Sequence, residues 1–431
     1  MNAINESWLS TADSGVLRLI TAGSVDDGKS TLIGRLLYDS KGVFADQLES
    51  IARSKYKRVA ASEIDLSLLT DGLEAEREQG ITIDVAYRYF ATPLRKFIVA
   101  DAPGHEQYTR NMVTGASTAQ VAIILIDASR VVNGELLPQT KRHSALAKML
   151  GLQHIVVAVN KMDLAGWDSQ LFEQIREAYA ALAEKLGIAQ FHIVPISALK
   201  GDNVVERSGN TPWYDGLPLL ALLENLPAAT SAAQTSARFF VQWVIRHGGH
   251  DVNDFRGYAG QLSGGSLRVG DEIKVLPSGE SAKVARLVQF DRDADLVIGG
   301  DSVTVVLDRD IDVSRGDLIV AADAPVRVTK EFEAELCWLD QQALSPVRQY
   351  WLKQGTRVTQ AKVKAVHTRR DMHELLHVEA GGALAMNDIG RVTLVSRDLL
   401  AIDSYADQPV TGSFILIDAA THQTAAAGMV R

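Results

Sequence analysis

The stretch Gly23-Ser24-Val25-Asp26-Asp27-Gly28-Lys29-Ser30 (GSVDDGKS) follows an apolar run, residues 17–22, near the beginning of the sequence. Its glycines let the backbone curl so that successive amide N–H groups point inward, and the amino end of a following helix adds positive potential. A loop of this spacing between a strand and a helix holds the phosphates of a nucleoside triphosphate, and a chance Gly-rich turn is the weaker interpretation. We expect Lys29 to reach the β- and γ-phosphates, the Ser30 hydroxyl to bind Mg²⁺, and Thr31 to extend the binding segment.

Apolar runs alternate with helical spacing through the first half of the chain. The predicted strands are residues 17–22, 85–90, 97–100, 121–127, 155–160 and 192–196. Helical spacing is clear at 29–38 and 139–150. Short apolar strands alternating with helices indicate an α/β domain whose mostly parallel sheet is covered on both faces. Ligands of such sheets bind outside the carboxyl ends of the strands, so functional residues are expected there.

Asp101-Ala102-Pro103-Gly104-His105 follows the strand predicted at 97–100. An aspartate that leaves a buried strand beside a phosphate loop is suited to holding Mg²⁺ through water. Gly104 can bring its N–H close to a γ-phosphate because it has no side chain. His105 alone would be read as a solvated loop histidine. Its place after Asp101 and Gly104 favours a role in orienting the attacking water.

A charged, glycine-containing segment, DGLEAEREQGITIDVAY at 71–87, leads into the second predicted strand. Thr82 is placed to add its hydroxyl to Mg²⁺ when a γ-phosphate is present, and loss of that phosphate would release the segment. Taken alone, Thr82 would be read as a threonine that opens a strand. The predicted catalytic residues are therefore Lys29, Thr82, Gly104 and His105, and the predicted metal-binding residues are Ser30, Thr82 and, through water, Asp101.

The base is expected to bind at Asn160-Lys161-Met162-Asp163, which ends the strand at 155–160. The Asp163 carboxylate can accept from guanine N1–H and the exocyclic amine together, whereas adenine has no such donor pair, and sites built on buried hydrogen bonds reject analogues that lack them. Asn160 would brace the loop, Lys161 would lie over the ring, and Ser197-Ala198-Leu199 would offer a backbone N–H to guanine O6. Four motifs in this order, each at a strand end, predict a GTPase that uses GTP and Mg²⁺.

The pattern of residue types changes after the first half of the sequence. Residues 228–236 are small, include no apolar periodicity and are predicted to be a linker. In 257–290, turn signals recur about every ten residues, which is typical of a β-barrel or a β-sandwich. Later β-type runs are residues 359–367, 390–395 and 413–418. The predicted parts are an N-terminal arm (1–13), a GTP-binding domain (14–227), the linker (228–236) and two β-barrel domains (237–325 and 326–431).

Composition excludes several classes of protein. Lys and Arg number 44 against 53 Asp and Glu, a formal charge of -9, so nucleic acid is not expected as a partner. The one cysteine, Cys337, is expected to be a core thiol and requires no oxidising compartment. Residues 1–15 lack the order of a secretory signal, and the longest apolar run, 121–126, is too short for a bilayer. We expect a cytoplasmic protein without a membrane partner.

The ordered motifs GSVDDGKS, GITI, DAPGH, NKMD and SAL, followed by barrels, resemble the translational GTPase superfamily, including elongation factor Tu, over nearly the whole chain. Within it, the chain is similar to the GTPase subunit of bacterial sulfate adenylyltransferase. Asp27 and Ser30 favour this narrower match, since elongation factors usually carry histidine and threonine there. Ala102 departs from the threonine common at its place, and no consequence is expected. The residues that carry the narrower match are 23–41, 71–90, 101–117, 254–260, 275–279, 314–318 and 408–418.

The resemblance implies a GTP-hydrolysing subunit of a heterodimeric enzyme. A small catalytic partner subunit would bind ATP and sulfate and form adenosine 5′-phosphosulfate and pyrophosphate, and GTP hydrolysis would drive this uphill step of sulfate assimilation. No arginine finger is evident apart from Arg77 in the charged segment, so hydrolysis by the isolated chain is expected to be slow. Some relatives carry a fused kinase, which is not expected here because no second phosphate loop precedes Arg431.

Two alternatives stay open from the residues. One is a translation-elongation-type GTPase that carries aminoacyl-tRNA, and steep loss of tRNA binding with salt would be its mark. The negative charge, Asp27 and the barrel motifs weigh against it. The other is a GTP-dependent regulatory switch without coupled synthesis, which a coupled assay with the small subunit would separate from the first hypothesis.

Overall fold

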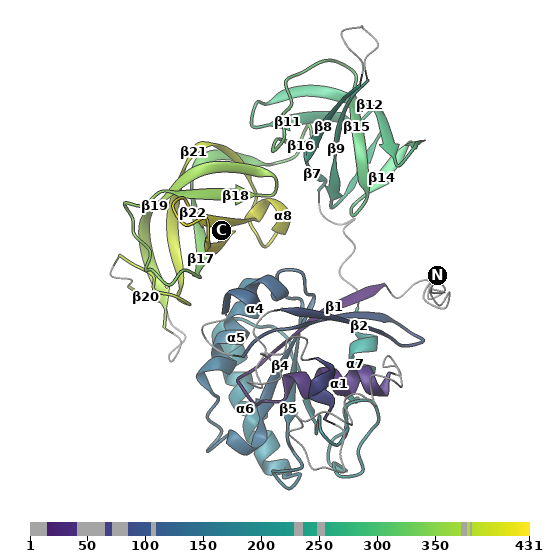
Figure 1. The fold of residues 1–431 in the computed structure, drawn as a ribbon, viewed down its shortest axis with the longest axis vertical. Coiled ribbons are helices and arrows are strands. Elements are labelled where there is room, and N and C mark those ends of the chain that lie inside the picture. Colours follow the sequence, from purple (N-terminus) through teal and green to yellow (C-terminus); the bar gives the residue numbers. More distant parts are fainter. Residues whose placement is uncertain are drawn as a thin grey trace. The chain divides into compact units, whose positions relative to one another are not determined.

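The computed structural model describes residues 15–40, 65–70, 85–104, 109–227, 236–247, 255–371, 377–379 and 382–431. The chain forms two compact units that divide near residue 230. In the described part of the chain, the first unit contains one sheet with helices on both faces, and the second is built mainly of strands (Figure 1).

The first unit is built on a six-stranded sheet with the order β2-β3-β1-β4-β5-β6. Its strands are β1 (Val16–Ala22), β2 (Ala86–Ala91), β3 (Lys96–Asp101), β4 (Val121–Asp127), β5 (His154–Asn160) and β6 (His192–Pro195). All neighbours pair in parallel except β2, which is antiparallel to β3 at the edge. The predicted mostly parallel sheet is confirmed.

The helical elements of the first unit are α1 (Lys29–Asp39), η2 (Leu66–Leu69), α4 (Thr109–Ala116), η4 (Ala128–Arg130), α5 (Pro138–Met149), α6 (Ser169–Leu186) and α7 (Leu219–Asn225). Local sequence sets several of their ends. Pro138 opens α5, where its missing N–H costs nothing. The Asp168 side chain caps α6 by accepting the Gln170 N–H at 2.8 Å, and Gly187 ends it at a φ of 69°.

Successive strand residues point to opposite faces, so a strand buried on both faces is apolar throughout. Every residue of β4 is buried. On one face, α1 and α7 pack through Leu36 and Leu223 into a buried cluster with Leu19 and Ile123. On the other face, α4 contacts β1 and β3, and α5 contacts β4. The predicted covering of both faces is confirmed (Figure 1).

The second unit contains two closed six-stranded rings. In the first, β11-β16-β7-β9-β15-β12 closes by pairing of β12 with β11. In the second, β18-β22-β23-β17-β21-β19 closes by pairing of β19 with β18. Closure leaves no ring strand with an unpaired edge. Both predicted β-barrels are confirmed.

The first barrel comprises β7 (Arg238–Phe240), β8 (Trp243–His247), β9 (Phe255–Ser263), β10 (Ser266–Arg268), β11 (Glu272–Leu276), β12 (Glu280–Gln289), β13 (Arg292–Ala294), β14 (Leu296–Ile298), β15 (Ser302–Leu307) and β16 (Leu318–Ala321). The second comprises β17 (Arg327–Trp338), β18 (Tyr350–Gln354), β19 (Arg357–Arg370), β20 (His377–Glu379), β21 (Ile389–Ile402), α8 (Pro409–Gly412), β22 (Ser413–Asp418) and β23 (Thr424–Val430).

The two barrels contact each other within this unit. Arg238 of β7 donates to both carboxylate oxygens of Asp403, at 2.8 and 3.0 Å, and the two side chains are 2% and 9% exposed. Phe240 and Leu318 of the first barrel share a buried cluster with Ala401 of the second. A bidentate pair of this kind combines charge with a fixed geometry, so it sets the register of one barrel on the other.

The predicted boundaries at 14–227, 237–325 and 326–431 stay predictions. The arm, 1–13, lies outside the described residues, as does the linker apart from Ser236. Cys337 is buried in β17, as expected of a core thiol. Among the residues that the structure describes, no helix is long and apolar enough to cross a membrane.

Candidate functional site

The carboxyl ends of the parallel strands meet at one edge of the sheet. Thr21 at the end of β1 is level with Asp101 at the end of β3, and Asp127 of β4 is level with Asn160 of β5. The loop that begins at the end of β6 lies next in the sheet order. The sequence motifs therefore lie around one edge, as the topology of a parallel sheet requires.

The phosphate loop, Gly23 to Ser30, joins β1 to α1. Gly28 has a φ of 91°, which a glycine adopts without strain, and it immediately precedes the first turn of α1. Lys29 is buried, and its Nζ donates to the carbonyl oxygens of Gly23 at 3.1 Å and Ser24 at 2.8 Å. Burial lowers the pKa of Lys29, while the charge of Asp101 acts in the opposite direction.

Asp27 places a carboxylate inside the phosphate loop. Its side chain is 0% exposed, and Oδ2 accepts the Ser24 N–H at 2.5 Å. Within the described part of the chain, Oδ1 has no hydrogen-bond partner. Burial raises the pKa of Asp27 to about 6, against the lowering effect of the Lys29 charge. A buried carboxylate in a loop that receives phosphates needs a compensating charge.

Asp101 and Gly104 border the loop from β3. Ser30 Oγ donates to Asp101 Oδ2 at 3.4 Å, and Thr21 Oγ1 donates to Asp101 Oδ1 at 3.5 Å. A Cβ added to Gly104 would lie 2.6 Å from Lys29 Nζ and 2.8 Å from the Gly23 carbonyl oxygen. Only a residue without a side chain allows this approach. Ala102 and Pro103 between them are buried.

Asn160 links the phosphate loop to the loop after β6. Its Nδ2 donates to the Asp27 carbonyl oxygen at 2.8 Å, and its Oδ1 accepts the Ala198 N–H at 2.9 Å. Arg35 of α1 holds the same loop, donating from Nε to the Ala198 carbonyl oxygen at 3.1 Å and from Nη2 to that of Leu199. The two loops predicted to bind phosphates and base are thus one bonded structure.

The segment after β5 carries the remaining predicted base-binding residues. Lys161 has a φ of 62°, and its Nζ lies 2.8 Å from Asp127 Oδ2. Met162 is buried, with its N–H donated to the Ile196 carbonyl oxygen at 3.2 Å. Asp163 follows and is partly exposed.

The structure brings most of the predicted site residues together, but not all can be placed. Thr82 and His105, together with the segment 71–84, lie outside the described residues. Sequence reasoning missed Asp127, Arg35 and Arg130. Asp127 carries the same signal as Asp101, a carboxylate at the end of a buried strand, and could have been found by it. Arg35 lies within the matched segment 23–41 but at a position to which no role was given, and Arg130 lies in no recognised motif.

The oxygen atoms near Ser30 fit a hard cation. The hydroxyl of Ser30 and the carboxylate of Asp101 lie side by side, and such oxygens are the donors that Mg²⁺ prefers. Among the described residues there is no group of three or more His, Cys, Asp and Glu that could hold a metal. The Ser30 hydroxyl and the Asp101 carboxylate, completed by a phosphate and water, would form a chemically fitting donor set.

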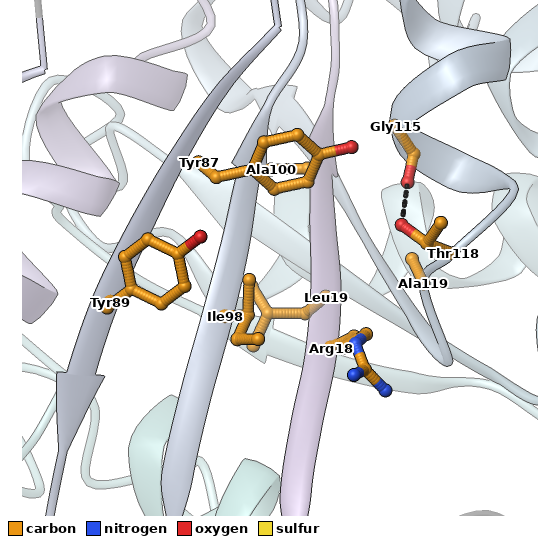
Figure 2. Close-up of a pocket in the computed structure, with 9 residues that line it drawn as sticks. All are labelled: Arg18, Leu19, Tyr87, Tyr89, Ile98, Ala100, Gly115, Thr118 and Ala119. Carbon is orange, nitrogen blue, oxygen red and sulfur yellow. Dashed lines mark hydrogen bonds between the residues drawn. The ribbon is translucent and has the colours of Figure 1, made fainter. Parts of the chain in front are cut away.

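A separate cavity of about 240 Å³ lies between strands β1, β2 and β3 and the end of α4. Figure 2 shows Tyr87 and Tyr89 projecting from β2 above Ile98 of β3, with Thr118 on the helical side. None of the residues predicted to bind GTP lines it. Its largely apolar lining is unsuited to phosphates, so the strand-end site remains the candidate.

Comparison with protein families supports a nucleotide-binding site in the first unit. Residues 14–232 match the elongation factor Tu GTP binding domain, and residues 331–431 match the GTP-eEF1A C-terminal domain-like family. The GTPase-like domain of Saccharomyces cerevisiae Ski7 bound to GTP is similar in structure, with a TM-score of 0.55 and 16% identity, over 100% of this chain and 99% of that one. At this identity the likeness concerns the fold.

Curated proteins are similar over nearly the whole chain. A bifunctional enzyme CysN/CysC of Mycobacterium tuberculosis is 50% identical over 416 residues, which are 96% of this chain and 67% of that protein. Sulfate adenylyltransferase subunit 1 of Tolumonas auensis is 49% identical over 96% of this chain and 86% of its own length. That of Salmonella typhi is 47% identical over 99% of this chain and 88% of its own.

Proposed function

The chain belongs to the sulfate adenylyltransferase subunit 1 family, and we propose that it is the GTP-hydrolysing subunit of a heteromeric sulfate adenylyltransferase. In this role, GTP hydrolysis drives the formation of adenosine 5′-phosphosulfate and pyrophosphate from ATP and sulfate. The adenylyl transfer takes place on a second, small catalytic subunit that binds ATP and sulfate. The proposed complex acts in the cytoplasm, in keeping with a sequence that has one cysteine.

One observation carries the assignment to GTP. The buried Asn160 amide bonds the phosphate loop at Asp27 and the loop after β6 at Ala198. Asp163 lies three residues after Asn160, so this bond supports a guanine site next to the loop that holds Lys29. Phosphate binding and guanine recognition then belong to one site, in which Asp163 accepts from the base and Lys161 lies over it.

The residues of the chain divide the work of hydrolysis. Lys29 turns from the Gly23 and Ser24 carbonyls to the β- and γ-phosphates, and the loop amides hold the γ-phosphate in line. Ser30, Thr82 and, through water, Asp101 would hold Mg²⁺, which neutralises charge between the two phosphates. The Gly104 N–H approaches the γ-phosphate, and His105 orients the attacking water.

The arrangement of domains fits this division of labour. We propose that residues 14–227 form the GTP-binding domain and that 237–325 and 326–431 form the barrels. The phosphate-binding and base-binding residues all lie in the first of these. The barrels contribute none of them and are available for contacts with the second subunit.

The test is synthesis of adenosine 5′-phosphosulfate from ATP and labelled sulfate by the complex with the small subunit, with and without GTP. We expect GTP to stimulate synthesis, and Lys29→Ala to abolish the stimulation while leaving the complex intact. Lys185→Ala, on the exposed side of α6, is the matched control and should behave as wild type. Synthesis that is indifferent to GTP would contradict the proposal.

A further inference from the structure

Arg130 reaches the phosphate loop from the short helix η4 that follows β4. Its Nη1 donates to the Val25 carbonyl oxygen at 2.9 Å and lies 3.6 Å from Asp27 Oδ1. Its side chain is 44% exposed, whereas that of Asp27 is fully buried. The guanidinium therefore stands at the mouth of the loop, with one face toward a buried carboxylate oxygen and the other toward solvent.

The contact between Arg130 and Asp27 is significant because of the surroundings of Asp27 Oδ1. Its partner oxygen, Oδ2, is held by the Ser24 N–H, but Oδ1 has no hydrogen bond within the described part of the chain. A buried carboxylate oxygen without a donor depends on nearby positive charge for its stability. In the described residues, Arg130 is the cation that forms an ion pair with it.

The other charges that face Asp27 have different partners. Lys29 lowers the pKa of Asp27 and Asp127 raises it, with burial as the largest cause. Lys29, however, is the residue expected to turn to the phosphates of a bound nucleotide. Asp127 is paired with Lys161 at 2.8 Å and accepts the Ser129 hydroxyl at 2.6 Å.

We propose that Arg130 is a positioning residue that compensates the buried Asp27 carboxylate and so allows the phosphate loop to accept a polyanionic nucleotide at neutral pH. The inference rests on the proposed function, since it assigns a role in the same GTP site. Phosphates add negative potential around Asp27 and draw Lys29 away from it. Arg130 is then the positive charge that allows the loop to bind phosphates while Asp27 is ionised.

This role predicts a pH-dependent defect with a definite sign. Without Arg130, nucleotide binding above the pKa of Asp27 brings phosphates toward an uncompensated buried charge. Below that pKa, a proton neutralises Asp27 and replaces the missing guanidinium. The loss of affinity in Arg130→Met should therefore be large at high pH and small at low pH. An arginine that merely stiffens the loop would give the same loss at every pH.

The experiment is calorimetric titration of GDP into the full chain at about pH 6 and about pH 8. Each variant is compared with wild type at the same pH, so that titration of the nucleotide itself cancels. We expect Arg130→Met to bind GDP about three- to tenfold more weakly at the higher pH and nearly normally at the lower. Repeating the titration in buffers of different ionisation enthalpy should show greater proton uptake by the variant than by wild type.

Three variants sharpen the test. Arg130→Lys keeps the charge and should restore much of the affinity at high pH. Asp27→Asn combined with Arg130→Met removes the charge to be compensated, and its affinity relative to wild type should not show the variant's pH dependence. Arg176→Met loses the same charge at a comparably exposed position on α6, 48% exposed, and should bind as wild type does.

A constant ratio of variant to wild-type affinity across pH would overturn the inference while leaving GTP binding intact. So would a pH-dependent defect that persists in the double variant. A wild-type chain that bound neither GDP nor GTP would contradict the proposed function itself, and the inference with it.

Discussion

Asn160 is bonded to Asp27 across the strand-end site, donating its Nδ2 hydrogen to the Asp27 carbonyl oxygen at 2.8 Å. Through Oδ1 the same amide accepts the Ala198 N–H at 2.9 Å. Asn160 is buried, so these two bonds are made away from water. One side chain therefore fixes the distance between the phosphate loop and the loop after β6.

Asn160→Ala should impair both folding and nucleotide binding. The change leaves a buried carbonyl and a buried N–H without partners, which costs about 1–3 kcal/mol for each group left unsatisfied. Urea denaturation measures the free energy of unfolding, and a separate titration of GDP into the folded protein measures nucleotide affinity. Asn225→Ala, which removes an exposed amide bond to the Ala221 carbonyl oxygen, is the control and should change neither substantially.

Gly104→Ala should weaken nucleotide binding by about tenfold or more, or about 1.4 kcal/mol. The added methyl would lie 2.6 Å from Lys29 Nζ and 2.8 Å from the Gly23 carbonyl oxygen, so the lysine or the loop must shift. Gly209→Ala meets no atom within 4 Å and controls for the substitution itself. Equal GTP affinities of the two variants would show that the close approach at Gly104 is unimportant.

Asp163→Asn should change base selectivity rather than phosphate binding. An amide can no longer accept from guanine N1–H and its amine together, so GDP affinity should fall by about a hundredfold or more. The new NH₂ group can donate to the extra carbonyl of xanthine, so xanthosine diphosphate should bind better than GDP. Asp215→Asn, at an exposed carboxylate, should keep the preference for guanine. Unchanged GDP binding by Asp163→Asn would place guanine recognition elsewhere.

His143 of α5 should make the protein less stable in mild acid. Burial, aided by the charges of Lys29 and Arg142, lowers the pKa of His143 from its ordinary 6.5 to about 3. The folded state then binds fewer protons than the unfolded state, so stability is present above pH 6.5 and is lost as the pH falls toward 3. Asp27 acts in the opposite sense, because its pKa is raised to about 6 and its protonation favours the folded state.

The measurement is the free energy of unfolding at several pH values for wild type and His143→Gln. Between about pH 6.5 and pH 5, wild type should lose about 2 kcal/mol more than the variant does. His192→Gln, at an exposed position of β6, should retain the wild-type dependence. The comparison concerns the slope with pH, so a uniform destabilisation of His143→Gln does not affect it.

The sequence predicts the parts of this fold that follow from local chemistry. Residues 121–127 form a strand because an unbroken apolar run can be buried on both faces, and β4 has the bounds expected. The strand predicted at 390–395 is in fact Ile389–Ile402. Its pairing with β17 is irregular between Thr329 and Glu331, and β21 has three exposed residues in succession there, so the alternation that marks a strand is broken.

The residues of the candidate site also divide into those that lie in sequence motifs and those that only the fold brings together. Lys29, Asp101 and Asn160 lie in short contiguous motifs, so the sequence alone marks them as candidates. The pairing of Arg130 with Asp27 joins residues that are far apart in the chain and obey no fixed spacing. It arises only when η4 is brought beside the phosphate loop by the parallel pairing of β1 with β4.

The most direct test of the account is the final level of adenosine 5′-phosphosulfate, rather than its initial rate, in a reaction of the complex with ATP and labelled sulfate. If GTP hydrolysis drives the synthesis, adding GTP should raise this level above the value reached with ATP and sulfate alone, and GDP should accumulate alongside the product. If GTP only shortened the time to reach the final level of adenosine 5′-phosphosulfate and did not raise that level, the result would contradict coupling. GTP would then act as an activator without supplying free energy.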